Sequence, residues 1–170
     1  MQVRIVEYAP AWPQEYEKEA TSIISILGDV LKNSFHIGST SVPDLSAKPI
    51  IDILLEVSDL DALDAKNQHM ELLGYEVKGE YGIPGRRYFR KGGDNRTHHV
   101  HAFKSGDPNL KRHLAFRDYL RAHPNIAQAY GRLKLEIANK GKDDMISYSD
   151  AKDPFIKLHE QKALIWYKNE

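Results

Sequence analysis

The sequence predicts an α+β (mixed α/β) fold in which a mixed sheet is flanked by helices and the carboxy-terminal part is helical. Two observations support this prediction. The first part holds short apolar or alternating segments separated by Gly, Pro and Ser, whereas from Pro108 onward apolar residues recur at three- and four-residue steps. The 170 residues show no repeat and no low-complexity segment. They therefore predict a single domain over residues 1–170.

The elements of the first part follow from local patterns. Residues 3–6 alternate like a short strand, and two prolines begin a helix whose apolar residues form one stripe. Strands are predicted at 35–37 and 50–57, and a loop rich in Gly, Ser and Pro connects them. Ser58 and Asp61 have the spacing of a capping box, which predicts a helix that ends at Gly74.

The second part begins with strands predicted at 75–77, 86–90 and 97–104, the last two joined by a Gly-Gly-Asp-Asn turn. Three helices follow. The first ends near Pro124, because the residue before a proline avoids the helical region, and the second stops near Gly141. The third carries Phe155, His159, Ala163 and Trp166 on one face.

Composition excludes several classes of function. The 24 Lys and Arg balance the 24 Asp and Glu, so no bulk charge attracts nucleic acid or an anionic membrane. Cysteine is absent, which excludes disulfides, thiolate metal sites and a cysteine nucleophile. No apolar run approaches the ~20 residues of a membrane helix. We therefore expect a soluble cytoplasmic protein with a small-molecule partner, and the oligomeric state stays open.

An acid in the predicted strand 50–57 is the first candidate for a functional residue. Alternation places Asp52, Leu54 and Glu56 on one face and the branched residues of the core on the other. Acids are rarely buried in so apolar a run unless they are paired or bound to a metal. Asp52 therefore either ligates a metal, caps a neighbouring loop, or pairs with Lys48 or an arginine. Glu56 lies near the strand end, where simple exposure is the alternative.

A turn of glycine and hydroxyl residues precedes this strand. Gly38 permits close backbone approach, and Ser39 and Thr40 offer hydroxyl donors to phosphate oxygens. The phosphate-loop pattern and the dinucleotide-binding glycine fingerprint are both absent from the sequence. The turn, followed at this spacing by an acid-bearing strand, favours phosphate binding beside a divalent metal.

The segments 36–43, 48–53 and 116–124, followed by Tyr130, Leu133 and Lys134, resemble the GrpB family. The resemblance covers nearly the whole chain. It implies the nucleotidyltransferase superfamily, whose polymerase-beta-like core is a mixed sheet flanked by helices. Family members also occur fused to dephospho-CoA kinase, which associates them with CoA-related ligands.

The resemblance implies a metal-dependent reaction and also exposes a departure from its pattern. In the superfamily, a Gly-Ser turn precedes an acid–hydrophobic–acid strand, and the acids hold Mg²⁺ ions that activate an acceptor hydroxyl. Gly38, Ser39 and Asp52 match this pattern, but Leu54 stands where the second acid is expected. Either Glu56 replaces it as the second catalytic acid or the two-metal mechanism is lost.

Three histidines fall within four residues of the strand 97–104. His99 and His101 share one face, and together with Asp52 they would form a metal site. Such a mixed site suits Mn²⁺ or Zn²⁺ better than Mg²⁺. The alternative is a polar strand that faces solvent.

Positive charge is concentrated around the strand 86–90. Arg86 and Arg90 share a face with Tyr88, so the arginines would bind phosphate and the ring would stack on a base. Lys48 would pair with Asp52 or meet a phosphate. Arg87 and Arg96 add to the local charge. An exposed hairpin kept soluble by charge is the alternative for any one of these arginines.

Three functions remain open from the sequence. The leading one is a nucleotide-binding or phosphate-binding protein that transfers a nucleoside monophosphate to a small acceptor. The second is a non-catalytic module that binds a nucleotide or a CoA-related ligand. The third is a metal-dependent hydrolase centred on Asp52, His99 and His101, in which the metal would activate a water.

Overall fold

A computed structural model of the chain describes residues 3–140 and 144–168. The chain divides into two compact units, each built from segments that are distant in sequence. One unit comprises residues 10–37 and 50–110, and the other comprises residues 1–9, 38–49 and 111–170. Because each unit is discontinuous, no shift of composition along the chain marks the division. We call them the sheet unit and the helical unit.

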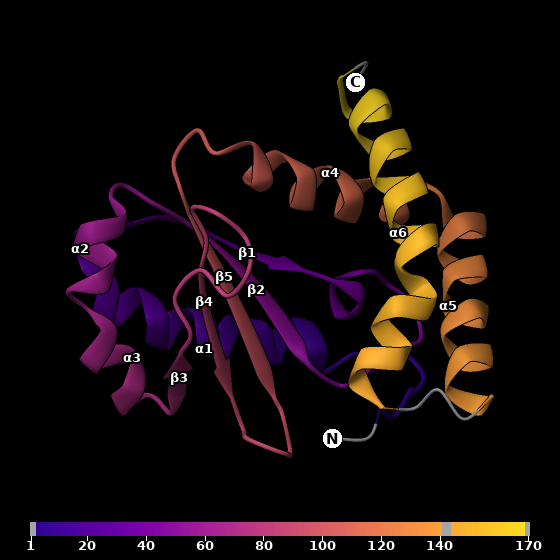
Figure 1. The fold of residues 1–170 in the computed structure, drawn as a ribbon, viewed down its shortest axis with the longest axis horizontal. Coiled ribbons are helices and arrows are strands. Elements are labelled where there is room, and N and C mark those ends of the chain that lie inside the picture. Colours follow the sequence, from indigo (N-terminus) through magenta and orange to yellow (C-terminus); the bar gives the residue numbers. More distant parts are fainter. Residues whose placement is uncertain (1–2, 141–143, 169–170) are drawn as a thin grey trace. The chain divides into compact units, whose positions relative to one another are not determined.

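The sheet unit contains a five-stranded sheet in the order β1-β2-β5-β4-β3 (Figure 1). Its neighbouring strands are antiparallel except for β2 and β5, which pair in parallel. The strands are β1 (Leu31–Ile37), β2 (Ile51–Val57), β3 (Tyr75–Val77), β4 (Arg87–Lys91) and β5 (His98–Lys104). The mixed sheet confirms the predicted fold class, and β2 through β5 lie within one or two residues of their predicted bounds.

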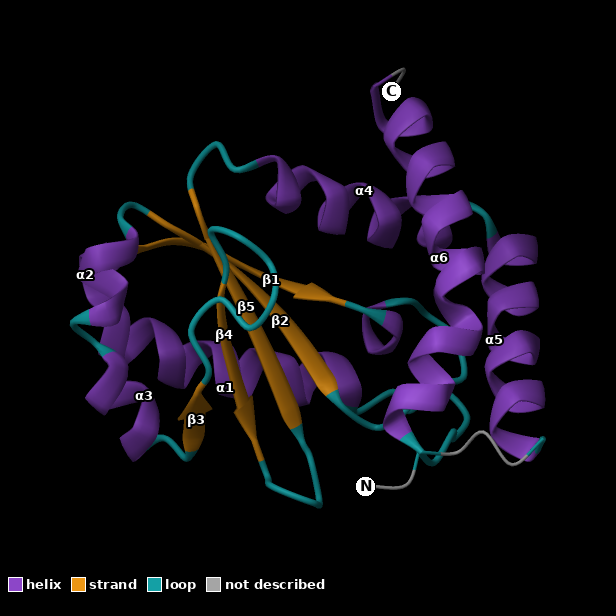
Figure 2. Ribbon diagram, viewed as in Figure 1, coloured by secondary structure: helices purple, strands orange, loops and turns teal. Residues whose placement is uncertain are grey.

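One face of this sheet is covered by helix α1 (Trp12–Leu27), which crosses β1 and β2 (Figure 2). The helix buries the stripe that the sequence predicted, and Gly28 ends it with a positive φ of 55°. Against it lie the alternate β2 residues of the core, none more than 2 % exposed: Ile51, Ile53, Leu55 and Val57. The period-two alternation therefore separates an apolar face from a polar one, as expected.

The predicted helix from Ser58 to Gly74 is wrong in two respects. It is split into α2 (Leu60–Asp64) and α3 (Asn67–Leu72), and its N-cap is Asp59, whose Oδ2 accepts the backbone N–H of Ala62 at 2.9 Å. A carboxylate one residue later is the stronger acceptor, while the backbone N–H of Ser58 donates to the carbonyl of Val30.

The helical unit contains most of α4 (Pro108–Ala122), and also α5 (Pro124–Asn139) and α6 (Met145–Lys168). Helices α5 and α6 lie side by side (Figure 1). The break between α4 and α5 falls at His123-Pro124, as predicted, whereas Gly141 lies outside the described residues. The predicted strand 3–6 is reduced to one bridge between Val6 and Ala47. No helix of the described residues is long and apolar enough to span a membrane.

Candidate functional site

Asp52 lies at the centre of a polar cluster on the face of the sheet opposite α1. The parallel register of β2 and β5 places Asp52 beside His99 and Leu54 beside His101. Both imidazoles approach the same carboxylate oxygen, Oδ1 of Asp52, from His99 Nδ1 at 3.4 Å and from His101 Nε2 at 3.4 Å. The Asp52 side chain is 26 % exposed, so a ligand can reach it. The structure thus brings together the three residues predicted as metal ligands.

The two histidines keep Asp52 ionised. Burial by itself would raise the pKa of the carboxyl group, but the hydrogen bonds and electrostatic interactions with His101 and His99 outweigh that effect. The pKa of Asp52 is therefore held well below its ordinary range. A negative charge is fixed on this face of the sheet at all moderate pH values.

Each histidine is contacted on its outer nitrogen by an arginine. Nη1 of Arg86 lies 3.4 Å from Nδ1 of His101, and Nη1 of Arg96 lies 3.3 Å from Nε2 of His99. Guanidinium groups only donate, so the outer nitrogen of each ring accepts, and the nitrogen that faces Asp52 carries the proton. Burial lowers the pKa of His101, which favours this neutral form. Two Arg–His pairs therefore converge on one carboxylate oxygen through long hydrogen bonds.

Aromatic rings lie over this cluster. The Tyr88 ring lies between the two histidines, with ring centroids 5.8 Å from His99 and 5.3 Å from His101. Cζ of Arg86 lies 4.8 Å from the same ring, and Tyr81 stacks on it at 5.1 Å with an interplanar angle of 16°. Burial and the charge of Asp52 raise the pKa of Tyr88 to about 12, so its hydroxyl stays protonated. A flat aromatic surface thus adjoins the charged groups.

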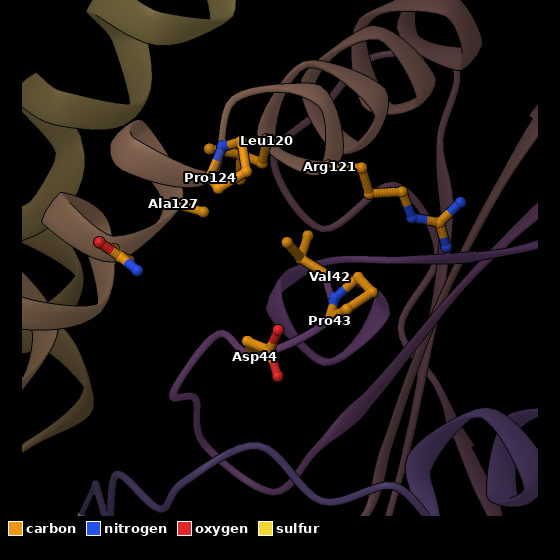
Figure 3. Close-up of a pocket in the computed structure, with 8 residues that line it drawn as sticks. Val42, Pro43, Asp44, Leu120, Arg121, Pro124 and Ala127 are labelled. Atoms are coloured by element: carbon orange, nitrogen blue, oxygen red, sulfur yellow. The ribbon is translucent and has the colours of Figure 1, made fainter.

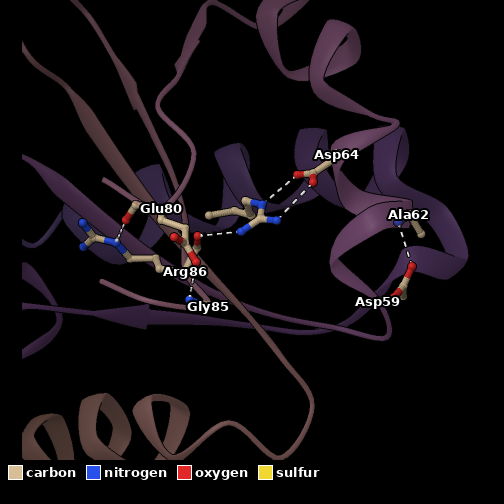
Figure 4. Close-up of polar contacts among 7 residues, drawn as sticks. Asp59, Ala62, Asp64, Glu80, Gly85 and Arg86 are labelled. Carbon is tan, nitrogen blue, oxygen red and sulfur yellow. Dashed lines mark hydrogen bonds and ion pairs between the residues drawn. The ribbon is translucent and has the colours of Figure 1, made fainter. Parts of the chain in front are cut away.

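The segment 79–86, which connects β3 to β4, is held by several hydrogen bonds of its own. Arg86 donates from Nη2 to the carbonyl of Tyr81 at 2.8 Å and from Nε to that of Glu80 at 3.1 Å. The carboxylate of Glu80 accepts the backbone N–H of Gly85 at 2.7 Å (Figure 4). Tyr81 has a φ of 48°, a rare conformation for so bulky a residue, and its side chain is 54 % exposed. The loop therefore holds an exposed ring beside the cluster at a cost in backbone strain.

Two other predicted residues of the sheet unit have partners outside the pair of histidines. Glu56 lies four residues along β2 from Asp52, roughly 13 Å of strand, and its Oε1 accepts Nδ2 of Asn33 at 2.7 Å. Arg90 contacts the hydroxyl of Tyr81 at 3.4 Å and lies 3.6 Å from the carboxylate of Glu76. Arg90 therefore adjoins the cluster, whereas Glu56 has a separate partner.

The position of the missing second acid is filled by packing. Leu54 is 0 % exposed, and its neighbours in register are Phe35 on β1 and His101 on β5. The apolar side chain is therefore part of the fold at this point.

The Gly-Ser turn belongs to the helical unit. Gly38 has φ 73° and ψ −175°, a conformation open in practice to glycine alone, and a single 3₁₀ turn follows from Ser39 to Ser41. The hydroxyl of Ser41 donates to the carbonyl of Gly38, and the backbone N–H of Ser41 donates to the same oxygen. Thr40 and Ser41 are buried, while Ser39 is half-buried. Lys48, farther along the segment, lies with Nζ 5.4 Å from the centroid of the Tyr148 ring.

The contacts of His99 and His101 with the arginines do not match those of an ordinary metal-binding histidine. Within residues 3–140 and 144–168, no group of three or more His, Asp or Glu side chains is placed to hold a metal ion. A metal-bound imidazole ordinarily donates its outer N–H to an acceptor, whereas the outer nitrogens of His99 and His101 accept from arginines. Metal binding by both rings would require their inner protons to leave. A metal here stays a prediction.

Arg96 is the residue that sequence reasoning left out of the candidate site. It follows the turn at Gly92–Asn95, and its charge alone gave no sign of the histidine it contacts. Tyr81 and Glu80 were likewise unassigned, because a loop with three glycines has no periodicity from which the direction of a side chain can be predicted. The only available signal was the density of arginine and tyrosine between residues 81 and 96.

Several known proteins are similar in sequence to this chain. "UPF0157 protein YqkA" of Bacillus subtilis (strain 168) is 46 % identical over 166 residues, which is 98 % of this chain and 48 % of that protein. The chain thus spans about half the length of that relative. Dephospho-CoA kinase of Mycobacterium bovis is 26 % identical over 188 residues, covering 96 % of this chain and 46 % of the kinase.

A solved structure and a family profile agree. The crystal structure of conserved protein GrpB from Enterococcus faecalis superposes with a TM-score of 0.93 and 46 % identity, covering 96 % of this chain and 99 % of that one. The sequence profile described as GrpB protein matches residues 2–162. On this evidence, the chain belongs to the GrpB family.

Proposed function

We propose that the polar face of the sheet binds a nucleotide or another phosphorylated small molecule. The observation that supports this most is the balance of charge around Asp52. Arg86 and Arg96 bring two permanent positive charges to the histidines that flank the one carboxylate at the centre, and Arg90, paired with Glu76, lies beside them. A face with surplus guanidinium groups attracts phosphate, whose oxygens match the guanidinium fork.

The tyrosines extend the proposal from a phosphate to a nucleotide. Tyr81 is exposed and stacks on Tyr88, so a planar base gains an aromatic neighbour directly beside the arginines. Phosphate recognition and ring stacking within one cluster suit a nucleotide better than an inorganic anion.

Metal-dependent nucleotidyl transfer to a small acceptor is the catalytic form of this proposal. Asp52 would hold the divalent ion, Mg²⁺ or Mn²⁺, with Zn²⁺ as an alternative. When bound, that ion would neutralise phosphate charge and polarise the reacting phosphoryl group. The chain's own residues would orient the ligand, with the arginines on the phosphates and the tyrosines on the base.

A non-catalytic binding module is the second candidate, and a specific observation favours it. Leu54, buried in the position where the superfamily carries its second acid, leaves Asp52 without an acidic partner on the strand. The similarity to a dephospho-CoA kinase adds CoA-related molecules to the ligands to be screened. The hydrolase alternative needs metal binding by both histidines and is tested by metal analysis of the purified protein.

The decisive experiment is a calorimetric titration of each NTP, with and without Mg²⁺ or Mn²⁺, into the wild type and the Asp52→Asn variant. If Asp52 holds the metal, we expect binding to depend on the metal and Asp52→Asn to weaken it about tenfold or more. If Asp52 serves only as counter-ion to the histidines and arginines, Asp52→Asn removes a repulsive charge and strengthens metal-free binding. Absence of binding by every NTP under every condition contradicts the nucleotide proposal and directs the screen to CoA-related ligands.

A further inference from the structure

We infer that Arg121 is an anion-binding residue of the turn Gly38–Ser41, where it takes a phosphate group. The inference rests on the proposed function only in that the ligand carries phosphate. Arg121 lies near the end of α4, about eighty residues from the turn in sequence, and both belong to the helical unit. Both lie in segments that carry the family resemblance, 36–43 and 116–124, but the contacts of the turn itself did not reveal this residue.

A hydrogen bond fixes the guanidinium group at the turn. Nε of Arg121 donates to the carbonyl oxygen of Ser41 at 2.9 Å. Because the guanidinium is a rigid plane, a bond through Nε also sets the direction of both Nη groups. The group is thereby oriented before a ligand arrives, which reduces the entropy lost on binding.

A comparison with Arg117, one helical turn earlier, shows which charge is already neutralised. Nε of Arg117 lies 2.9 Å from Oδ1 of Asp118, and its side chain is 16 % exposed. Nη1 of Arg121 lies 4.0 Å from the same oxygen, and its side chain is 41 % exposed. Asp118 therefore pairs with Arg117, and the charge on Arg121 is the less compensated of the two.

The surroundings of Arg121 would gain from an added negative charge. Burial and the neighbouring charge of Arg117 lower the pKa of the Arg121 guanidinium, so its charged form is held in an unfavourable field. An anion against the guanidinium relieves both effects. The half-buried Ser39 in the adjacent turn adds a hydroxyl donor of the kind that phosphate oxygens accept.

A cavity beside Arg121 provides space for the rest of such a ligand. It has a volume of about 440 Å³ and lies between the residues after the turn and the start of α5 (Figure 3). Its walls include Val42, Pro43, Leu120 and Pro124, so an uncharged portion of the ligand fits there. The carboxylate of Asp44 also lines the cavity, which disfavours a second anionic group inside it. The expected ligand therefore places its phosphate at Arg121 and an uncharged part in the cavity.

Two variants with opposite expected effects test the inference. Arg121→Gln removes the charge and keeps an amide near Ser41, so we expect affinity for pyrophosphate and for ATP to fall about tenfold or more. Asp118→Asn removes the nearest competing carboxylate, so we expect affinity to rise severalfold. Both are measured by isothermal calorimetry on the full chain, after circular dichroism has shown that each variant is folded.

The outcomes separate this inference from the proposed function. ATP binding that is unchanged in both variants overturns the role of Arg121 and leaves the proposed function intact. Pyrophosphate binding that depends on Arg121, without binding of any nucleotide, supports Arg121 and contradicts the nucleotide proposal. If neither pyrophosphate nor ATP binds the wild type, both fail.

Discussion

Arg86 and Arg87 are adjacent in sequence, but their side chains lie on opposite faces of the sheet. Arg87 binds a carboxylate, whereas Arg86 contacts uncharged groups. Arg87 forms a fork on Asp64, with Nε 2.8 Å from Oδ1 and Nη2 3.1 Å from Oδ2. Arg86 is directed to backbone carbonyls and to the ring of His101, and no carboxylate is among these contacts. The charge of Arg87 is therefore neutralised within the fold, whereas that of Arg86 adds to the field around Asp52.

The comparison shows how to tell a structural charge from a functional one. A bidentate bond to a carboxylate matches the guanidinium fork, neutralises its charge and raises the pKa of Arg87 further. Carbonyls and a neutral imidazole satisfy donors without cancelling charge. The guanidinium group of Arg86, held in this way, keeps its positive charge on the polar face of the sheet beside His101.

The largest expected effect comes from introducing an acid at Leu54, a buried apolar residue on the same face of the sheet as Asp52. Leu54→Asp buries a carboxylate at a fully enclosed position, so we expect the free energy of unfolding to fall by about 3 kcal/mol or more. Urea denaturation measures this, with Leu54→Met as the volume-matched control that costs less than about 1.5 kcal/mol. A loss below about 1 kcal/mol would show that the face tolerates a second acid, and the variant then becomes the one to assay for gained transferase activity.

An intermediate effect is expected from exchanging the two arginines for glutamine. Arg86→Gln removes a charge that faces the ligand, so affinity for a bound nucleotide should fall about tenfold, or about 1.4 kcal/mol. Arg87→Gln breaks the pair with Asp64 on the opposite face and should leave affinity within about twofold, while lowering stability by about 1 kcal/mol. Calorimetry and thermal unfolding of both variants separate the two roles. Equal losses of affinity would refute the distinction.

The smallest effect concerns pH and the histidines of β5. Burial lowers the pKa of His98 and of His101, which lie on opposite faces of the sheet. Each binds fewer protons folded than unfolded, so the free energy of unfolding falls as pH drops below the unfolded pKa of about 6.5. We expect His98→Gln to flatten part of this slope between pH 7 and 5 without changing ligand affinity. Urea denaturation at each pH measures this slope. A slope identical to that of the wild type would mean that His98 has the same pKa in the folded and unfolded states.

The fold was accessible from the sequence because its signals are local. The alternation in β2 and the helical stripe of α1 each depend on neighbouring residues, and both predictions are confirmed. The helix after β2 was placed wrongly because Ser58 and Asp59 are both good caps, and only tertiary contact with Val30 decides between them. Local patterns do not report such competition.

The candidate site was accessible only in part, because its contacts are long-range. Asp52, His99, His101, Arg86 and Tyr88 were recognised by residue type and alternation, and the parallel pairing of β2 with β5 brings them together. No local sequence pattern predicts that β2 pairs with β5 or that Arg96 contacts His99. The roles assigned to Lys48 and Glu56 relied on proximity along the chain, and the structure gives each a different neighbour, Tyr148 and Asn33.

The parallel pairing of β2 with β5 also has a consequence for folding. The antiparallel pair β4–β5 closes through a short turn and forms from local contacts, whereas β2 meets β5 across more than forty residues of chain. Such non-local pairing comes late, because the entropy of closing the intervening loop opposes it. The seam between these strands carries Asp52 on one side and both histidines on the other. We therefore expect a refolding chain to acquire its secondary structure first and the ability to bind a ligand only when this seam closes.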